Sequence, residues 1–224
     1  MPPTPLSVAV LAGGQSRRMG RDKALLSLRG RALLDHVLER VSGLGDDLFV
    51  VATDRPDYAR LGVRVVPDLL AGRGALGGIH TAISTARHPY CLVVACDMPF
   101  LSPELLTYMA ALPRDFDVLV PTLDASRSNQ GGSQTFETLH AIYGSTCLPA
   151  IERRLARGDL KVVDLLRDVR CRTIPESTIR RHDPELLSFV NANTPTDLDQ
   201  TRDRDHEAIS GAVGDDSDAG RTGR

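Results

Sequence analysis

The chain of 224 residues has few aromatic residues, few cysteines and almost no net charge. Aromatic residues make up 4% and Trp is missing, so the core has to be built from Leu, Val, Ile and Ala. A formal charge of −2 gives no reason to expect general attraction to nucleic acid or to membranes. The apolar content of 42% is still enough for a real core, and the length suits one α/β domain.

The cysteines show no metal-binding or redox motif. Cys91, Cys96, Cys147 and Cys171 include no C-x-x-C pair, and the first two lie in an apolar run, where we expect buried thiols. The first residues lack the basic and apolar regions of a secretory signal. No apolar stretch reaches the roughly 18 residues that indicate a membrane span. These features predict a cytoplasmic protein in a reducing compartment.

The most informative segment follows the first apolar run and reads LAGGQSRRMGRDK over residues 11–23. It combines two adjacent glycines with a group of cations: Gly13, Gly14, Arg17, Arg18 and Lys23. Paired glycines allow a positive φ and close approach to a ligand, and their N–H groups can form a concavity that binds anions. The spacing is neither that of a P-loop nor that of a dinucleotide fingerprint. The segment predicts a triphosphate site, in preference to a surface loop with a solvated basic run.

Short apolar runs alternate with helical patterns along the chain. Strands are expected at residues 7–12, 47–52, 63–66, 90–96 and 117–121. Helices are expected over residues 33–41, after Ser102 as N-cap, over 148–157 with Gly158 as C-cap, and near 194–197. This order predicts a three-layer α/β/α sandwich with a Rossmann-like, mostly parallel sheet, in which ligands lie at the carboxyl ends of the strands. One domain is expected over residues 1–200, with a disordered tail at 201–224.

Two aspartates directly follow predicted strands. Asp97 comes after the run at 90–96, where a carboxylate can hold Mg²⁺; the alternative is a turn or cap residue, although Ser102 already serves as the cap. Asp68 follows the run at 63–66 and either accepts hydrogen bonds from a base or sugar or ends a turn. The glycine-rich segment 72–78 is read as a loop that enters a helix at Ile79. A nearby base and simple flexibility explain its glycines equally well.

The segment LAGGQSRRMGRDKALL at 11–26 resembles the signature of the sugar-nucleotidyltransferase-like superfamily. Within it, the chain is most similar to the molybdenum cofactor guanylyltransferases. Further matching segments lie at 74–79, 96–101, 139–143, 148–152 and 189–195, so that the resemblance covers residues 7–200. It implies the fold of the nucleotide-diphospho-sugar transferases.

The resemblance also implies a reaction: transfer of GMP from GTP to molybdopterin with release of pyrophosphate, which forms the guanine dinucleotide form of the molybdenum cofactor. The implied cofactor is Mg²⁺. By this likeness, backbone groups of the first motif contact GTP, Lys23 contacts its phosphates, Asp68 the guanosine, and Asp97 both GTP and the metal. The full set of expected site residues is Leu11, Ala12, Gly13, Gly14, Arg17, Arg18, Lys23, Asp68 and Asp97, with Asn191 and Asn193 on the acceptor side.

Other functions stay open at this point. One alternative is another enzyme, either a cytidylyltransferase of the molybdenum cofactor or a nucleotidyltransferase for a sugar phosphate. A second alternative is a nucleotide-binding regulatory module without chemistry. The expected partners are GTP and molybdopterin, with no nucleic acid and no membrane. Transient contacts with other molybdenum cofactor proteins are compatible with the resemblance, as is a monomer or a small homo-oligomer.

Overall fold

The computed structural model describes residues 5–13, 23–53, 56–124 and 134–192. The chain divides into two compact units, Met1–Val190 and Asn191–Arg224, and every helix and strand below belongs to the first. Gly14, Arg17, Arg18 and Asn193 lie outside the described residues, as do the helix expected near 194–197 and the tail expected at 201–224. These expectations stay predictions.

The centre of the first unit is an eight-stranded sheet in the order β10-β7-β9-β6-β1-β4-β5, with β8 paired to β7. Its strands are β1 (Ser7–Leu11), β4 (Asp47–Val51), β5 (Arg64–Val66), β6 (Tyr90–Ala95), β7 (Val118–Asp124), β8 (Gln134–Phe136), β9 (His140–Gly144) and β10 (Cys171–Pro175). Strands β6, β1, β4 and β5 run parallel, whereas β9 is antiparallel to both β6 and β7. A separate hairpin pairs β2 (Ser27–Leu28) with β3 (Arg31–Ala32).

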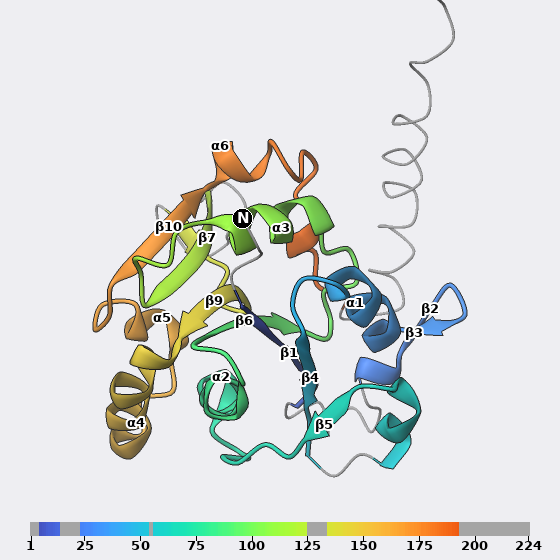
Figure 1. Ribbon diagram of the computed structural model, residues 1–224, viewed down its shortest axis with the longest axis horizontal. Coiled ribbons are helices and arrows are strands. Elements are labelled where there is room, and N and C mark those ends of the chain that lie inside the picture. Colours follow the sequence, from blue (N-terminus) through green and yellow to red (C-terminus); the bar gives the residue numbers. More distant parts are fainter. Residues whose placement is uncertain (1–4, 14–22, 54–55, 125–133, 193–224) are drawn as a thin grey trace, which may run out of the picture. The chain divides into compact units, whose positions relative to one another are not determined.

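Helices cover both faces of this sheet, which gives the expected three layers (Figure 1). Helices α1 (Leu33–Val41) and α3 (Pro103–Ala111) pack on one face, and α2 (Gly74–Thr85), α4 (Leu148–Arg157) and α5 (Val162–Leu165) pack on the other. The remaining helical elements are α6 (Glu176–Ile179) and the 3₁₀ turns η2 (Lys23–Leu25), η3 (Pro56–Leu61), η5 (Ser145–Cys147) and η6 (Leu187–Phe189). Each face has its own apolar cluster, made almost entirely of aliphatic side chains, as the shortage of aromatic residues predicts.

Local signals predicted several elements correctly. The Ser102 hydroxyl accepts a hydrogen bond from the Leu105 N–H at 3.3 Å and so caps α3, with Pro103 in the first turn. Gly158 ends α4 in the left-handed conformation, with φ of 73°. The expected start of the second helix is wrong, because α2 begins at Gly74 and not at Ile79. The segment at 74–78 is therefore the first turn of a helix and not a loop.

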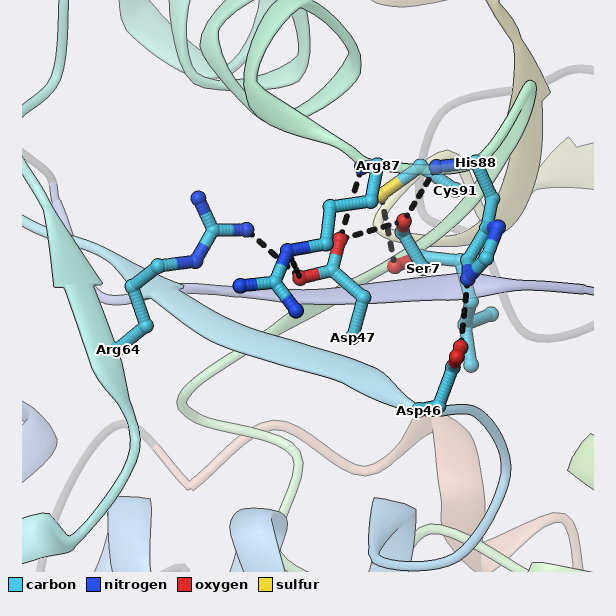
Figure 2. A network of polar contacts seen from close by, with 8 residues as sticks. Ser7, Asp46, Asp47, Arg64, Arg87, His88 and Cys91 are labelled. Atoms are coloured by element: carbon cyan, nitrogen blue, oxygen red, sulfur yellow. Dashed lines mark hydrogen bonds and ion pairs between the residues drawn. The ribbon is translucent and has the colours of Figure 1, made fainter.

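Polar contacts join the strands at the amino-terminal edge of the sheet, opposite to the carboxyl ends of β1, β4 and β6 (Figure 2). The buried Asp47 carboxylate accepts hydrogen bonds from the Ser7 hydroxyl at 2.6 Å, the Arg87 N–H at 2.9 Å and the Arg64 guanidinium at 2.7 Å. Ser7 in turn accepts the His88 N–H at 3.1 Å. This network ties β1, β4, β5 and the segment before β6 together.

The cysteines behave as expected from their apolar surroundings. The four cysteines form no disulfide; Cys91, Cys96 and Cys147 are buried, and Cys171 is half-buried. Burial raises the pKa of the Cys91 thiol far above its ordinary value, which keeps this thiol protonated and unreactive.

In the described part of the chain, no helix is long and apolar enough to cross a membrane.

Candidate active site

The first motif leaves the sheet between two neighbouring strands. Directly after β1, the Ala12 N–H donates to the Val51 carbonyl at 2.9 Å, and the Leu11 carbonyl accepts the Cys96 N–H at 3.1 Å. Leu11 and Ala12 are buried, whereas Gly13 is exposed at the carboxyl edge. Gly13 does not have a positive φ, and a Cβ there would lie 3.9 Å from the Val51 carbonyl oxygen, an ordinary contact. Its own backbone therefore does not require glycine, and a contact of Gly13 with a ligand stays a prediction.

Two of the predicted site residues meet at this edge. Lys23 in η2 and Asp97 just after β6, which are 74 positions apart, form an ion pair between Nζ and Oδ2. The Lys23 side chain is 23% exposed and the Asp97 side chain 19%, so solvent or a ligand reaches both. Because β1 and β6 are parallel neighbours, their carboxyl ends bring the first motif and Asp97 to the same side of the sheet.

The donor set at Asp97 fits a magnesium ion that is shared with a substrate. In the described residues, no group of three or more His, Cys, Asp and Glu side chains could hold a metal. Mg²⁺ does not need such a group, since it is commonly bound through one or two carboxylates together with phosphate oxygens and water. Asp97 supplies one hard oxygen ligand, and Lys23 supplies a cation that can bind phosphate instead of the carboxylate.

Asp68 lies beyond the carboxyl end of β5 and is half-buried. Its Oδ1 atom accepts hydrogen bonds from the Leu70 N–H at 3.1 Å and from the Thr81 hydroxyl at 2.9 Å. Thr81 also accepts the Leu69 N–H at 3.1 Å, so that Asp68 ties its own turn to α2. Asp68 therefore takes part in a turn, as one of its two interpretations expects. Both contacts use the same oxygen, and a contact of Oδ2 with guanosine stays a prediction.

Packing explains two glycines of α2, Gly77 and Gly78, whereas Gly74 has a positive φ of 62°. A Cβ on Gly77 would lie 2.9 Å from the Leu70 carbonyl oxygen and 2.8 Å from the Arg73 Cβ, which is too close for either to stay in place. A Cβ on Gly78 would lie 3.1 Å from a methyl carbon of Leu11, at the end of β1. Gly77 thus lets the helix pack against the turn that precedes it, and Gly78 lets it approach the start of the first motif. Neither flexibility nor a base is needed to account for these two glycines.

Sequence reasoning missed one part of this edge, which antiparallel β9 brings there. His140, the first residue of β9, lies opposite Val94 in β6 and close in register to Asp97. Both of its ring nitrogens are buried and lack a hydrogen-bond partner among the described residues, and burial lowers its pKa to about 3. The imidazole is therefore neutral at physiological pH. The apolar residues at 141–143 were the available signal for this strand.

Two asparagines were expected to bind the acceptor. Of these, Asn191 is exposed and begins the second unit, and Asn193 lies outside the described residues.

The fold and the lysine–aspartate pair at the carboxyl edge define an α/β protein built to bind a phosphorylated ligand. Comparison with known proteins identifies the family. The family model described as "MobA-like NTP transferase domain" matches residues 8–173. The chain belongs to this family and is a nucleotidyltransferase.

Named relatives span almost the whole chain. A "probable molybdenum cofactor guanylyltransferase" of Pelotomaculum thermopropionicum is 38% identical over 204 residues, which cover 91% of this chain and 95% of that protein. The "molybdenum cofactor guanylyltransferase" of Desulfosudis oleivorans is 37% identical over 193 residues, with 85% and 91% covered. Among solved structures, "molybdopterin-guanine dinucleotide biosynthesis protein A" of Archaeoglobus fulgidus is similar, with a TM-score of 0.73, 31% identity and 90% and 99% covered.

Proposed function

We propose that this protein transfers GMP from GTP to molybdopterin. The names of relatives up to 38% identical over most of the chain support this reaction. The single observation that carries the chemistry is the pairing of Lys23 with Asp97 at the carboxyl edge of β1 and β6. Together they offer one cation for phosphate and one carboxylate for a metal.

In the proposed reaction, an oxygen of the terminal phosphate of molybdopterin attacks the α-phosphorus of GTP. The new bond joins this oxygen to the α-phosphorus, and the bond from the α-phosphorus to the bridging oxygen breaks, so that pyrophosphate leaves with that electron pair. A phosphate monoester is largely ionised near neutral pH, because its second pKa is about 6. No residue has to remove a proton, which agrees with the inert Cys91 and the buried, neutral His140.

The remaining tasks are alignment and charge neutralisation, on which phosphoryl-type transfers depend. We assign phosphate binding to Lys23, with Arg17 and Arg18 as further cations from the first motif. Asp97 would hold Mg²⁺, which when bound neutralises charge on the phosphates. In the protein without nucleotide, Lys23 and Asp97 neutralise each other. A magnesium-bound triphosphate offers each a new opposite charge, so the pair can separate at low cost.

We assign Asp68 to guanosine binding, and Asn191 and Asn193 to acceptor binding. The four free thiols agree with a protein that works in the cytoplasm.

The decisive experiment measures pyrophosphate release with molybdopterin and each of the four nucleoside triphosphates in turn. We expect turnover with GTP alone, and none without Mg²⁺. Turnover with CTP would instead identify a cytidylyltransferase. Binding of GTP without pyrophosphate release in the presence of the acceptor would identify a regulatory module.

A further inference from the structure

The loop that carries Asp97 is held at both of its ends. At its start, the Cys96 N–H donates to the Leu11 carbonyl at 3.1 Å, which ties the loop to β1. At its end, the Ser102 N–H donates to the Ser188 hydroxyl oxygen at 2.8 Å. Ser188 is 86 positions away in the sequence and is completely buried. The position of Asp97 therefore depends on a segment far along the chain.

Ser188 is itself held in place by a buried carboxylate. Asp183 accepts the Ser188 N–H at 2.9 Å on Oδ2 and the Leu187 N–H at 3.0 Å on Oδ1, and it is only 6% exposed. In the other direction, the Ser102 hydroxyl donates to the His182 carbonyl at 2.7 Å. We call Ser102, Asp183 and Ser188 the brace.

Ring contacts on both sides join the segment of the brace to helix α3 and to strand β9. The His182 ring stacks on Tyr108 of α3 with centroids 4.5 Å apart. The Phe189 ring lies 4.9 Å from that of His140, at the start of β9. Figure 1 shows this segment in orange-red beside α3. It thus contacts two elements whose ends lie near Asp97.

Helix capping alone does not explain these contacts. Ser102 caps α3 through its hydroxyl oxygen, which accepts the Leu105 N–H, and this needs nothing from Ser188. The bond to Ser188 uses the Ser102 backbone N–H, which belongs to the end of the loop. Few residues separate this bond from Asp97, and Pro99 among them has no N–H with which to hold the loop. The Ser188 hydroxyl is thus placed to limit the movement of the Asp97 carboxylate.

We infer that Ser188, oriented by Asp183, is a positioning residue for Asp97 in nucleotidyl transfer. It touches no reacting atom, and it acts by holding the end of the loop through Ser102. This inference rests on the proposed function for its kinetic consequence, but its structural consequence is independent of that function. Catalytic groups displaced by about 1 Å can lose up to 10²-fold in rate, so a loosened loop has a measurable effect.

The test compares Ser188→Ala with Ser7→Ala in the full-length protein. Ser7 is an equally buried serine, whose hydroxyl donates to Asp47 and accepts the His88 N–H at the opposite edge of the sheet. Both variants lose buried hydrogen bonds, but only one disturbs the Asp97 loop. Asp183→Asn, which keeps the size of the side chain and one acceptor oxygen, is a second, milder variant in case Ser188→Ala does not fold.

Hydrogen exchange and kinetics are measured on the same samples. In Ser188→Ala, we expect amide exchange in residues 97–105 to be about tenfold faster than in the unaltered protein. We expect kcat to fall about tenfold or more, with a smaller change in KM for GTP, and the Mg²⁺ concentration for half-maximal rate to rise. Ser7→Ala should show none of these changes at a temperature where it is folded.

Each other result overturns the inference. Unchanged exchange in residues 97–105 would show that Ser188 does not hold the loop. Faster exchange with unchanged kcat, or an equal kcat loss in Ser7→Ala, would leave only a structural role. If the unaltered protein transfers no GMP, the proposed function fails. GTP binding at a series of Mg²⁺ concentrations then decides. A higher Mg²⁺ concentration for half-maximal GTP binding in Ser188→Ala alone supports the positioning of Asp97, and equal Mg²⁺ concentrations in all three proteins refute it.

Discussion

Replacing Asp47 tests whether the network at the amino-terminal edge of the sheet stabilises the fold without affecting GMP transfer. Its side chain is 2% exposed and accepts hydrogen bonds from Ser7, the Arg87 N–H and the Arg64 guanidinium (Figure 2). We consider Asp47→Asn, which keeps the size of the side chain and removes the charge. Removing one partner of a buried ion pair costs about 3–5 kcal/mol.

The exposure of the partners places this variant at the low end of that range. The Arg64 side chain is 34% exposed and that of Arg87 is 68% exposed, so water solvates both guanidinium groups once the carboxylate is gone. Little of the cost then comes from a stranded cation, and most comes from the Ser7 hydroxyl and the Arg87 N–H. We expect a loss of about 3 kcal/mol in the free energy of unfolding at pH 7. For a protein of this size, that corresponds to a Tm lower by about 6–12 °C.

The free energy of unfolding that is lost in Asp47→Asn should be smaller at acid pH than at neutral pH. Burial raises the pKa of Asp47, but the hydrogen bonds from Ser7, Arg87 and Arg64 outweigh this effect and hold the pKa below its ordinary value of 3.8. A carboxyl with a lowered pKa in the folded state stabilises the fold fully at pH values above its ordinary pKa. This stabilisation is lost as the pH falls through the folded-state pKa. The difference between the two proteins should therefore be constant near neutrality and shrink below pH 3.8.

Urea unfolding at a series of pH values measures this difference directly. A loss of less than about 1 kcal/mol at pH 7 would show that the network is no stronger than a surface ion pair. A difference that grows toward acid pH would contradict the sign of the argument. Transfer activity at a temperature where Asp47→Asn is folded should equal that of the unaltered protein, because the network lies at the edge opposite Asp97.

The remaining predictions concern the site and the helix beside it. Asp97→Ala should abolish GMP transfer while circular dichroism shows an intact fold; near-normal turnover would remove the assignment of the metal to this residue. Lys23→Ala should lower kcat/KM by about 10²-fold or more, as for the loss of one preorganised charge stabiliser, and a loss below tenfold would reject its role. Gly77→Ala should destabilise the protein by about 1–3 kcal/mol in thermal unfolding, because its Cβ would collide with the Leu70 carbonyl. A variant as stable as the unaltered protein would mean that α2 can shift without cost.

Elements with strong local signals were predictable. The stripe at 33–41 forms α1, Ser102 caps α3, and Gly158 ends α4, since each signal acts within a few residues of the chain. The α2 start was missed because three glycines near it look like loop residues. Gly74 has a positive φ, and the contacts that leave no room for a Cβ on Gly77 and Gly78 are known only from the structure. Strands β8, β9 and β10 were not predicted, because polar residues, Gly or Pro interrupt their short apolar runs and their pairing partners lie elsewhere in the chain.

The sequence by itself determined the alternation of strands and helices, the family resemblance and the types of residue needed to bind a triphosphate. The alternation follows from periodicity and capping, and the resemblance follows from the matching motif segments. All of these are properties of neighbouring residues. Only the tertiary structure decided that Lys23 forms an ion pair with Asp97 and that one carboxylate oxygen of Asp68 accepts a hydrogen bond from Thr81. It also decided that the Ser188 hydroxyl accepts the Ser102 N–H at the end of the Asp97 loop. Such contacts join residues far apart in the chain, and they depend on strand order and side-chain packing, which no local pattern specifies.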